Sequence, residues 1–186
     1  MKNAFFSLAM IVAAAAPAWA AEDAHTAFVT EKAAVWMASP VIQQALAAGN
    51  EAHAALTEAE ILDLDTLWRA QIDSTDSPLI NQVMSGPASD YLRQLVADSQ
   101  GSIAEIIVMD NRGLNAAISA VTSDYWQGDE DKFQQTYDIG AGAIHAGDVE
   151  LDESTGLYVV QVSMPIADSE GRLVGAATFS LDAERL

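Results

Sequence analysis

The chain has 186 residues, a formal net charge of −19 at pH 7 and no cysteine. This charge repels nucleic acid and anionic membrane surfaces, so we expect neither as a partner. The missing cysteines exclude disulfides, thiolate catalysis and cysteine metal sites, so the core alone must stabilise the fold. Because the acidic residues are spread along the chain, the charge pattern by itself identifies no binding surface.

The first 20 residues have the pattern of a secretory signal. Lys2 supplies a positive start, an apolar run follows over 4–16, and Ala-Trp-Ala at 18–20 matches a small-x-small cleavage site. The run is too short to cross a bilayer comfortably. We therefore expect cleavage after Ala20, a periplasmic or secreted protein with no membrane insertion after signal removal, and one domain over 21–186. Retention of the segment as an N-terminal anchor is the alternative.

The segment 24–100 is predicted to be a helical half. Apolar residues at helical spacing predict a first helix over 24–37. Ser39 and Pro40 have the pattern of an N-cap and a first helical residue, and Gly49 is placed to close that second helix. Three further signals follow: a capping box at Thr57-x-x-Glu60, a short helix between Ser77-Pro78 and Gly86-Pro87, and a last helix marked by Tyr91, Leu92, Leu95 and Val96.

The segment 102–182 is predicted to be a sheet half. Apolar, β-branched runs stop three times at an acid-to-glycine turn and then restart. Such turns join antiparallel strands, because the acid bonds its own backbone and glycine accepts positive φ. The turns are Asp110–Gly113, Asp152–Gly156 and Asp168–Gly171, and the five strands are expected at 103–109, 114–121, 149–151, 157–164 and 173–181.

Two features of the sheet half remain. The crossing Thr122–Gly142 is too long for a tight turn, and Asp129–Tyr137 within it is predicted to be helical. In the fourth strand the alternation places Tyr158, Val160, Val162 and Met164 on one apolar face, which we expect to pack against helices. Gln161 and Ser163 fall on the other face, where buried polar groups need partners from the protein or from a ligand.

The order of helices, two strands, a helical crossing and three strands resembles the Cache (extracellular PAS-like) sensor domains. The resemblance rests on IIVMDNRGLNAAIS, on TSDYWQGDE and on VSMPIADSEGRLVGAATFSLD, with LWRA at 67–70 similar to a helix that supplies an aromatic and an arginine in some members. It implies a mixed α/β (α+β) domain: a PAS-like five-stranded antiparallel sheet with an N-terminal helical layer.

The resemblance also implies a function. It predicts an exported, non-catalytic sensor of the single-domain, free-standing type that binds a small solute such as an amino acid, an amine or an organic acid. Because the chain stops shortly after Leu181, signalling would pass through another protein, such as a membrane signalling protein, and a homodimer is a further option. Two alternatives remain open: an interaction or dimerisation module without a ligand, and an enzyme of unknown reaction.

Four adjacent residues of TSDYWQGDE are the main candidates for ligand binding. Tyr125 and Trp126 supply flat apolar surface with polar edges, suited to enclosing a small organic molecule. Asp124 can accept a hydrogen bond from an amine, and Gln127 can donate and accept. The alternative is structural, with Asp124 as a turn or cap residue and Trp126 packed in the core.

Four more residues complete the predicted site. Arg69 can bind a carboxylate in a bidentate fork, although Asp65 four residues earlier offers it an ordinary ion pair. Trp68 is the helix aromatic of the resemblance, and its place on the apolar face also suits the core. Gln161 and Ser163 would supply polar groups from the sheet.

No other chemistry is indicated. The alternating carboxylates of Asp148, Glu150 and Asp152 lack EF-hand spacing, and an exposed strand face explains them better than Ca²⁺. The histidines are isolated, and no hydrolase or metalloprotease motif occurs. We therefore expect no metal, no cofactor and no catalytic residue. The isolated histidines are His25, His53 and His145.

Overall fold

The structure, a computed structural model, describes residues 24–152 and 156–185. The predicted signal segment 1–20 lies outside the described residues, so its cleavage stays a prediction. None of the helices in the described part of the chain combines the length and the apolar character that a membrane span requires.

A five-stranded antiparallel sheet forms the centre of the molecule, in the order β2-β1-β5-β4-β3. This confirms the predicted mixed class and the PAS-like sheet. Every predicted strand is present, but β3 is longer and β2 shorter than expected. The strands are β1 Ile103–Asp110, β2 Asn115–Ile118, β3 His145–Asp152, β4 Leu157–Ala167 and β5 Leu173–Asp182.

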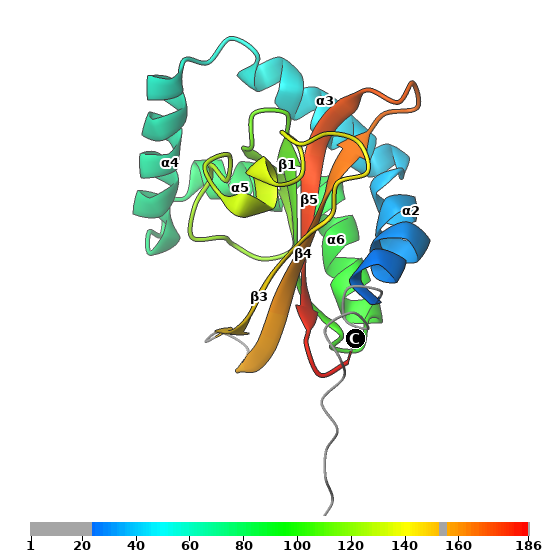
Figure 1. The fold of residues 1–186 in the computed structure, drawn as a ribbon. Helices are drawn as coiled ribbons and strands as arrows, with labels where there is room; N and C mark the ends of the chain where they lie inside the picture. The colour runs from blue at the N-terminus through cyan, green and yellow to red at the C-terminus, as the bar shows by residue number, and fades with distance from the viewer. Residues whose placement is uncertain (1–23, 153–155, 186) are drawn as a thin grey trace, which may run out of the picture.

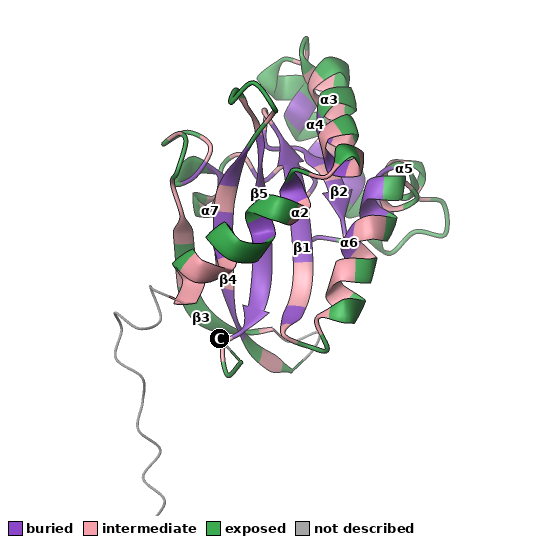
Figure 2. Ribbon diagram, turned by 90° about the vertical axis from the view of Figure 1, so that its right-hand side faces the viewer, coloured by how far each residue is buried: buried purple, intermediate pink, exposed green. Residues whose placement is uncertain are grey.

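Helices cover both faces of this sheet, as Figure 1 shows. Alternation along β1 sends Ile106 and Val108 into one core cluster and Ile107 and Met109 into the other. The predicted N-terminal helical layer is therefore divided between the two faces, and the central strands are buried on both sides (Figure 2). The first face carries η1 Val29–Ala33, α2 Ala34–Met37, α3 Pro40–His53 and α6 Pro87–Asp98; the second carries α4 Glu58–Ile72, α5 Pro78–Met84 and α7 Asp131–Gln134.

The predicted acid-to-glycine turns form as expected where they are described in full. Oδ1 of Asp110 accepts from the backbone N–H groups of Arg112 and Leu114, at 2.8 and 3.0 Å. Asp168 makes the same two contacts to Glu170 and Arg172, at 2.9 and 3.0 Å. The glycine that ends each turn has φ of +80°. Local side-chain chemistry therefore fixes both hairpins.

Helix α3 differs from its prediction. It begins at Pro40, but Ser39 makes no side-chain capping bond, and the helix continues through Gly49 to His53. Gly49 lies inside the helix, at a position where an added Cβ would stand 3.3 Å from the Cβ of Asp110. The glycine permits close approach of α3 to the end of β1 and does not terminate the helix. By contrast, the Thr57 capping box is confirmed, with both reciprocal bonds present.

The edge strand β3 is the most exposed strand of the sheet. Asp148 and Glu150 point into solvent, and Val149 and Leu151 are also exposed. Tyr158 on the paired strand is 55% exposed, so the prediction that it packs under a helix is wrong. The rest of that β4 face packs into the core under the helices, with Val160 and Val162 buried and Met164 partly buried.

Alanine substitution of two turn glycines separates backbone strain from steric contact. Gly113 and Gly171 share φ of +80°, but a Cβ on Gly113 would lie 2.5 Å from Cα of Gly128, whereas a Cβ on Gly171 meets nothing within 4 Å. We expect Gly171→Ala to lower the free energy of unfolding by about 1 kcal/mol. Gly113→Ala should cost roughly 1–3 kcal/mol more because of the overlap. Urea unfolding of both variants measures the difference, and equal losses would contradict the contact.

Candidate functional site

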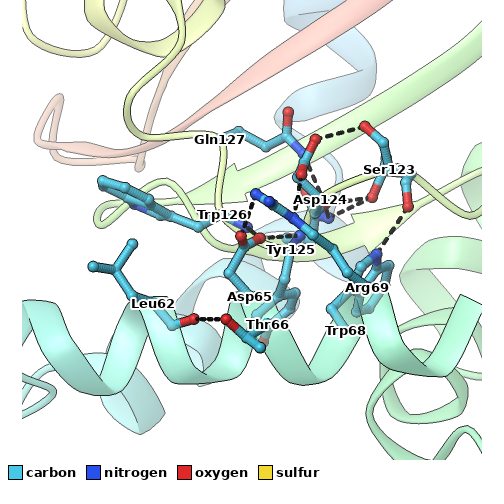
Figure 3. Close-up of polar contacts among 12 residues, drawn as sticks. Leu62, Asp65, Thr66, Trp68, Arg69, Ser123, Asp124, Tyr125, Trp126 and Gln127 are labelled. Carbon is cyan, nitrogen blue, oxygen red and sulfur yellow. Dashed lines mark hydrogen bonds and ion pairs between the residues drawn. The ribbon is translucent and has the colours of Figure 1, made fainter.

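Asp65 of α4 organises the segment that contains most of the predicted site (Figure 3). Its buried carboxylate accepts from the backbone N–H groups of Tyr125 and Trp126 at 2.9 and 3.1 Å, through Oδ1. Its Oδ2 pairs with Arg69 at 2.5 Å, and the same guanidinium reaches Asp124 at 2.7 Å. The polar groups of Arg69 and Asp124 are therefore engaged with each other and with α4.

Two aromatic residues of the site, Trp68 and Tyr125, pack against each other. Trp68 is fully buried and donates through Nε1 to the carbonyl of Thr122 at 2.8 Å. Its ring stacks on Tyr125 with a centroid separation of 5.2 Å. This contact makes Trp68 a core residue that holds the crossing segment against α4.

Trp126 and Gln127 are also held by the protein. Trp126 donates through Nε1 to the carbonyl of Arg112 at 2.9 Å, and Gln127 is buried with its amide bonded to the Asp124 carbonyl and to Lys132. Gly128 makes room for this arrangement, since a Cβ there would lie 2.4 Å from the indole nitrogen. The segment TSDYWQG thus packs against the Asp110–Gly113 turn between β1 and β2.

The structure brings six of the eight predicted site residues together, but their polar groups bond to other residues of the protein. Gln161 and Ser163 lie apart from them on β4. Ser163 is buried and shares a hydrogen bond of 2.9 Å with Thr178. Of the eight, only Tyr125 lines the groove described below. A ligand-binding role for the other seven stays a prediction.

Removal of the Asp65 carboxylate should weaken the attachment of the 122–127 segment to α4. Asp65→Ala leaves two backbone N–H groups and Arg69 without their acceptor, so we expect a loss of roughly 3–5 kcal/mol in the free energy of unfolding. Asp63→Ala, at an exposed position of the same helix, should change it by less than about 0.5 kcal/mol. Urea unfolding checks both values. A similar small effect for Asp65→Ala would show that the segment holds without this anchor.

Gln161 lines a separate depression of about 420 Å³ on the sheet, together with Glu105 and Ser180. Burial raises the pKa of Glu105 from its ordinary 4.5 to about 7; the positive charge of Lys132 opposes the shift and Asp152 adds to it. Glu150 and Asp152 also line this depression. Nevertheless, across the described residues no group of three or more His, Asp or Glu side chains could hold a metal ion.

The shifted pKa of Glu105 predicts a pH-dependent stability. Between about pH 4.5 and 7 the folded state keeps a proton that the unfolded chain has lost, so this residue favours folding below pH 4.5 and that contribution disappears as pH rises to 7. Glu105→Gln removes the effect. The free energy of unfolding of the Glu105→Gln variant, minus that of the wild type, should rise by about 3 kcal/mol between pH 4.5 and pH 8.

Glu150→Gln removes a neighbouring exposed carboxylate and controls for the loss of one negative charge. Urea titrations at several pH values measure both differences. A flat difference for Glu105→Gln would contradict the burial of its carboxyl.

Figure 2 shows α3, α5 and α6 around β2 at the edge of the sheet. A groove of about 340 Å³ lies between these elements. One wall is the face of α3 that carries small residues, and the other is the α5–α6 junction. Asn115 and Ala116 of β2 lie between these walls, with Tyr125 beside them. The α3 wall consists of Val41, Gln44, Ala45, Ala48, Gly49, Ala52 and His53, and the opposite wall of Gln82, Val83 and Gly86 to Ser89.

A chain of polar contacts runs from the end of β1 to the groove. Asp110 is fully buried, and its Oδ2 lies 2.5 Å from Nδ1 of His53. Nε2 of His53 lies 3.3 Å from the hydroxyl of Tyr125. Burial, with a smaller effect from the negative charge of Asp110, raises the pKa of the Tyr125 phenol well above its ordinary 10, so the hydroxyl stays protonated. Both His53 and Tyr125 line the groove.

Asn115 lines the groove and has one unsatisfied atom. Its Nδ2 donates to Thr122 Oγ1 at 2.8 Å and to the Asp124 carbonyl at 2.9 Å. Both partners accept hydrogen bonds, which fixes the orientation of the amide. Its Oδ1 is buried and has no hydrogen-bond partner among the described residues. A buried unsatisfied acceptor costs about 1–3 kcal/mol, so a ligand donor that reached this atom from the groove would be stabilised.

Sequence reasoning missed most residues of this groove. In the sequence His53 is an isolated histidine, and Asn115 lies in a predicted strand with no motif beside it. One signal was present: Ala45, Ala48, Gly49 and Ala52 share one face of a helix, and such small residues leave space beside it. The partners that turn this space into a groove belong to α5, α6, β2 and the crossing segment, all distant from α3 along the chain.

No protein-family model and no curated protein matches the chain, but solved structures do. The ligand-binding domain of the Campylobacter jejuni chemoreceptor Tlp3, in complex with 4-methylisoleucine, has 13% identity and a TM-score of 0.42 over 80% of this chain and 63% of that one. The extracellular domain of vpHK1S-Z8 has 13% identity and a TM-score of 0.46 over 89% and 53%.

An extracellular ligand-binding receptor from Desulfohalobium retbaense has 13% identity and a TM-score of 0.40 over 76% of this chain and 24% of that one. The chain therefore spans less than two thirds of each of these structures. The predicted resemblance to extracellular sensor domains agrees with these neighbours. The likenesses are remote in sequence and geometry, and they assign no ligand to this chain.

Proposed function

We propose that this protein is an exported, non-catalytic domain that binds a small solute in the groove between α3, α5, α6 and β2. The observation that carries the proposal is the groove itself, at whose side the buried Oδ1 of Asn115 has no hydrogen-bond partner within residues 24–152 and 156–185. Its volume of about 340 Å³ falls within the range of small-molecule sites, which are concave, mostly apolar and furnished with a few polar groups.

The groove has contacts through which binding could be transmitted. Asn115 and Tyr125 line it, and both are bonded within the 122–127 segment that Asp65 ties to α4. A solute that contacts these two side chains would stabilise that segment against α4. The exposed surface of α4 would then be the part presented to a partner such as a membrane signalling protein. Homodimer formation stays a separate prediction.

A pair of matched substitutions tests whether the groove binds solutes. Ala47 and Ala48 are adjacent, exposed residues of α3, but only Ala48 lines the groove. A ligand that binds only the folded state raises its melting temperature. We expect a thermal-shift screen of small solutes to give hits with the wild type. Ala48→Phe should abolish these shifts by filling the groove, and Ala47→Phe should preserve them.

Both variants place the same side chain on the same helix, so a difference between them reports the groove and not helix propensity. Hits that survive Ala48→Phe would place the ligand elsewhere. A screen in which no solute raises the melting temperature would contradict the proposed function.

A further inference from the structure

The uncharged lining of the groove restricts the kind of ligand that it can bind. Among the described residues that line it, none is Lys, Arg, Asp or Glu. Its polar side chains are neutral amides and hydroxyls, together with His53. A carboxylate or an ammonium group that entered would lose its hydration without gaining an opposite charge, and unpaired buried charges are strongly disfavoured.

Two charged side chains behind the α3 wall of the groove are already engaged. Asp110 lies behind the groove wall at Gly49, and its carboxylate is bonded by Arg112 N, Leu114 N and His53. The guanidinium of Arg112 donates to the carbonyls of His53 and Leu56, at 3.3 and 3.2 Å, and does not line the groove. Neither residue can pair directly with a bound ion without breaking these contacts.

The hydrogen-bonding groups of the groove favour a donor on the ligand. The Oδ1 of Asn115 can only accept. When Nδ1 of His53 donates to Asp110, Nε2 accepts from the Tyr125 hydroxyl, and the Tyr125 oxygen is left as a second acceptor. The small alanines of α3 and the α5–α6 junction surround the remaining volume with apolar atoms.

We infer that the groove selects an uncharged, partly apolar solute that carries an N–H or O–H donor, such as a short-chain primary amide, over its charged isosteres. This inference rests on the proposed function, since it concerns the same groove. It excludes free amino acids as the preferred ligands, because a zwitterion requires a cation and an anion that the groove lining lacks.

Four probes with a common branched alkyl group test the inference: isovaleramide, methyl isobutyl ketone, isovalerate and isoamylammonium. The ketone has the shape of the amide without its donor, and the last two are ions at neutral pH. Binding is followed by backbone amide chemical shifts of the wild-type protein at millimolar probe concentrations. We expect the amide to bind at least about tenfold more tightly than either ion, and several-fold more tightly than the ketone.

Two conservative variants test the Tyr125 hydroxyl. Tyr125→Phe should weaken amide binding by about three- to tenfold and leave ketone binding nearly unchanged. Tyr137→Phe removes a hydroxyl from a half-buried ring stacked on Phe133, away from the groove, and should change neither. Equal weakening of amide and ketone by Tyr125→Phe would overturn the hydroxyl as an anchor.

The outcomes separate this inference from the function on which it rests. Tighter binding of isovalerate or isoamylammonium than of the amide, with sensitivity to Ala48→Phe, would overturn the selectivity and leave the groove as the binding site. Ketone affinity equal to amide affinity would overturn the donor requirement alone. Absence of binding by all four probes, or binding that Ala48→Phe does not reduce, would contradict the proposed function itself.

Discussion

The buried carboxylate of Asp110 connects three parts of the molecule. One oxygen closes the turn between β1 and β2, and the other contacts His53 at the end of α3. Through that imidazole it also positions the hydroxyl of Tyr125, a residue of the crossing segment. A fully buried carboxylate is tolerated only when each of its acceptor sites has a donor, so the relative positions of the turn and of α3 are closely constrained. These contacts set the separation between α3 and β2, and the groove lies between the two elements.

A second buried carboxylate plays the corresponding role on the other face of the sheet. Asp65 fastens the 122–127 segment to α4, and the stacked rings of Trp68 and Tyr125 lie beneath it. Tyr125 therefore belongs to both arrangements: its backbone and ring face are held by α4, and its hydroxyl points toward His53. The cluster of aromatic and polar residues in TSDYWQGDE fixes one side of a binding groove by its internal contacts, and it is this one tyrosine that reaches the groove.

The fold was largely predictable from the sequence because its signals are local. The bonds of Asp110 and Asp168 reach two and four residues along the chain, and the Thr57 capping box reaches three, so a short window of sequence contains each of them. Gly49 shows where local reasoning fails: its role depends on contact with Asp110, and a helix-ending glycine has the same appearance in sequence. The groove could not be predicted, because Asn115 and His53 acquire their roles only when β2 and α3 meet.

The exposed edge of the sheet has a consequence for self-association. An uncovered outer strand offers its free backbone groups to any other strand, and a second copy of the same chain is the commonest one available. The side chains of Asp148 and Glu150 on β3 point into solvent at that edge. Two molecules that approached strand to strand would bring these carboxylates into mutual repulsion. This repulsion disfavours strand-to-strand association along the open edge.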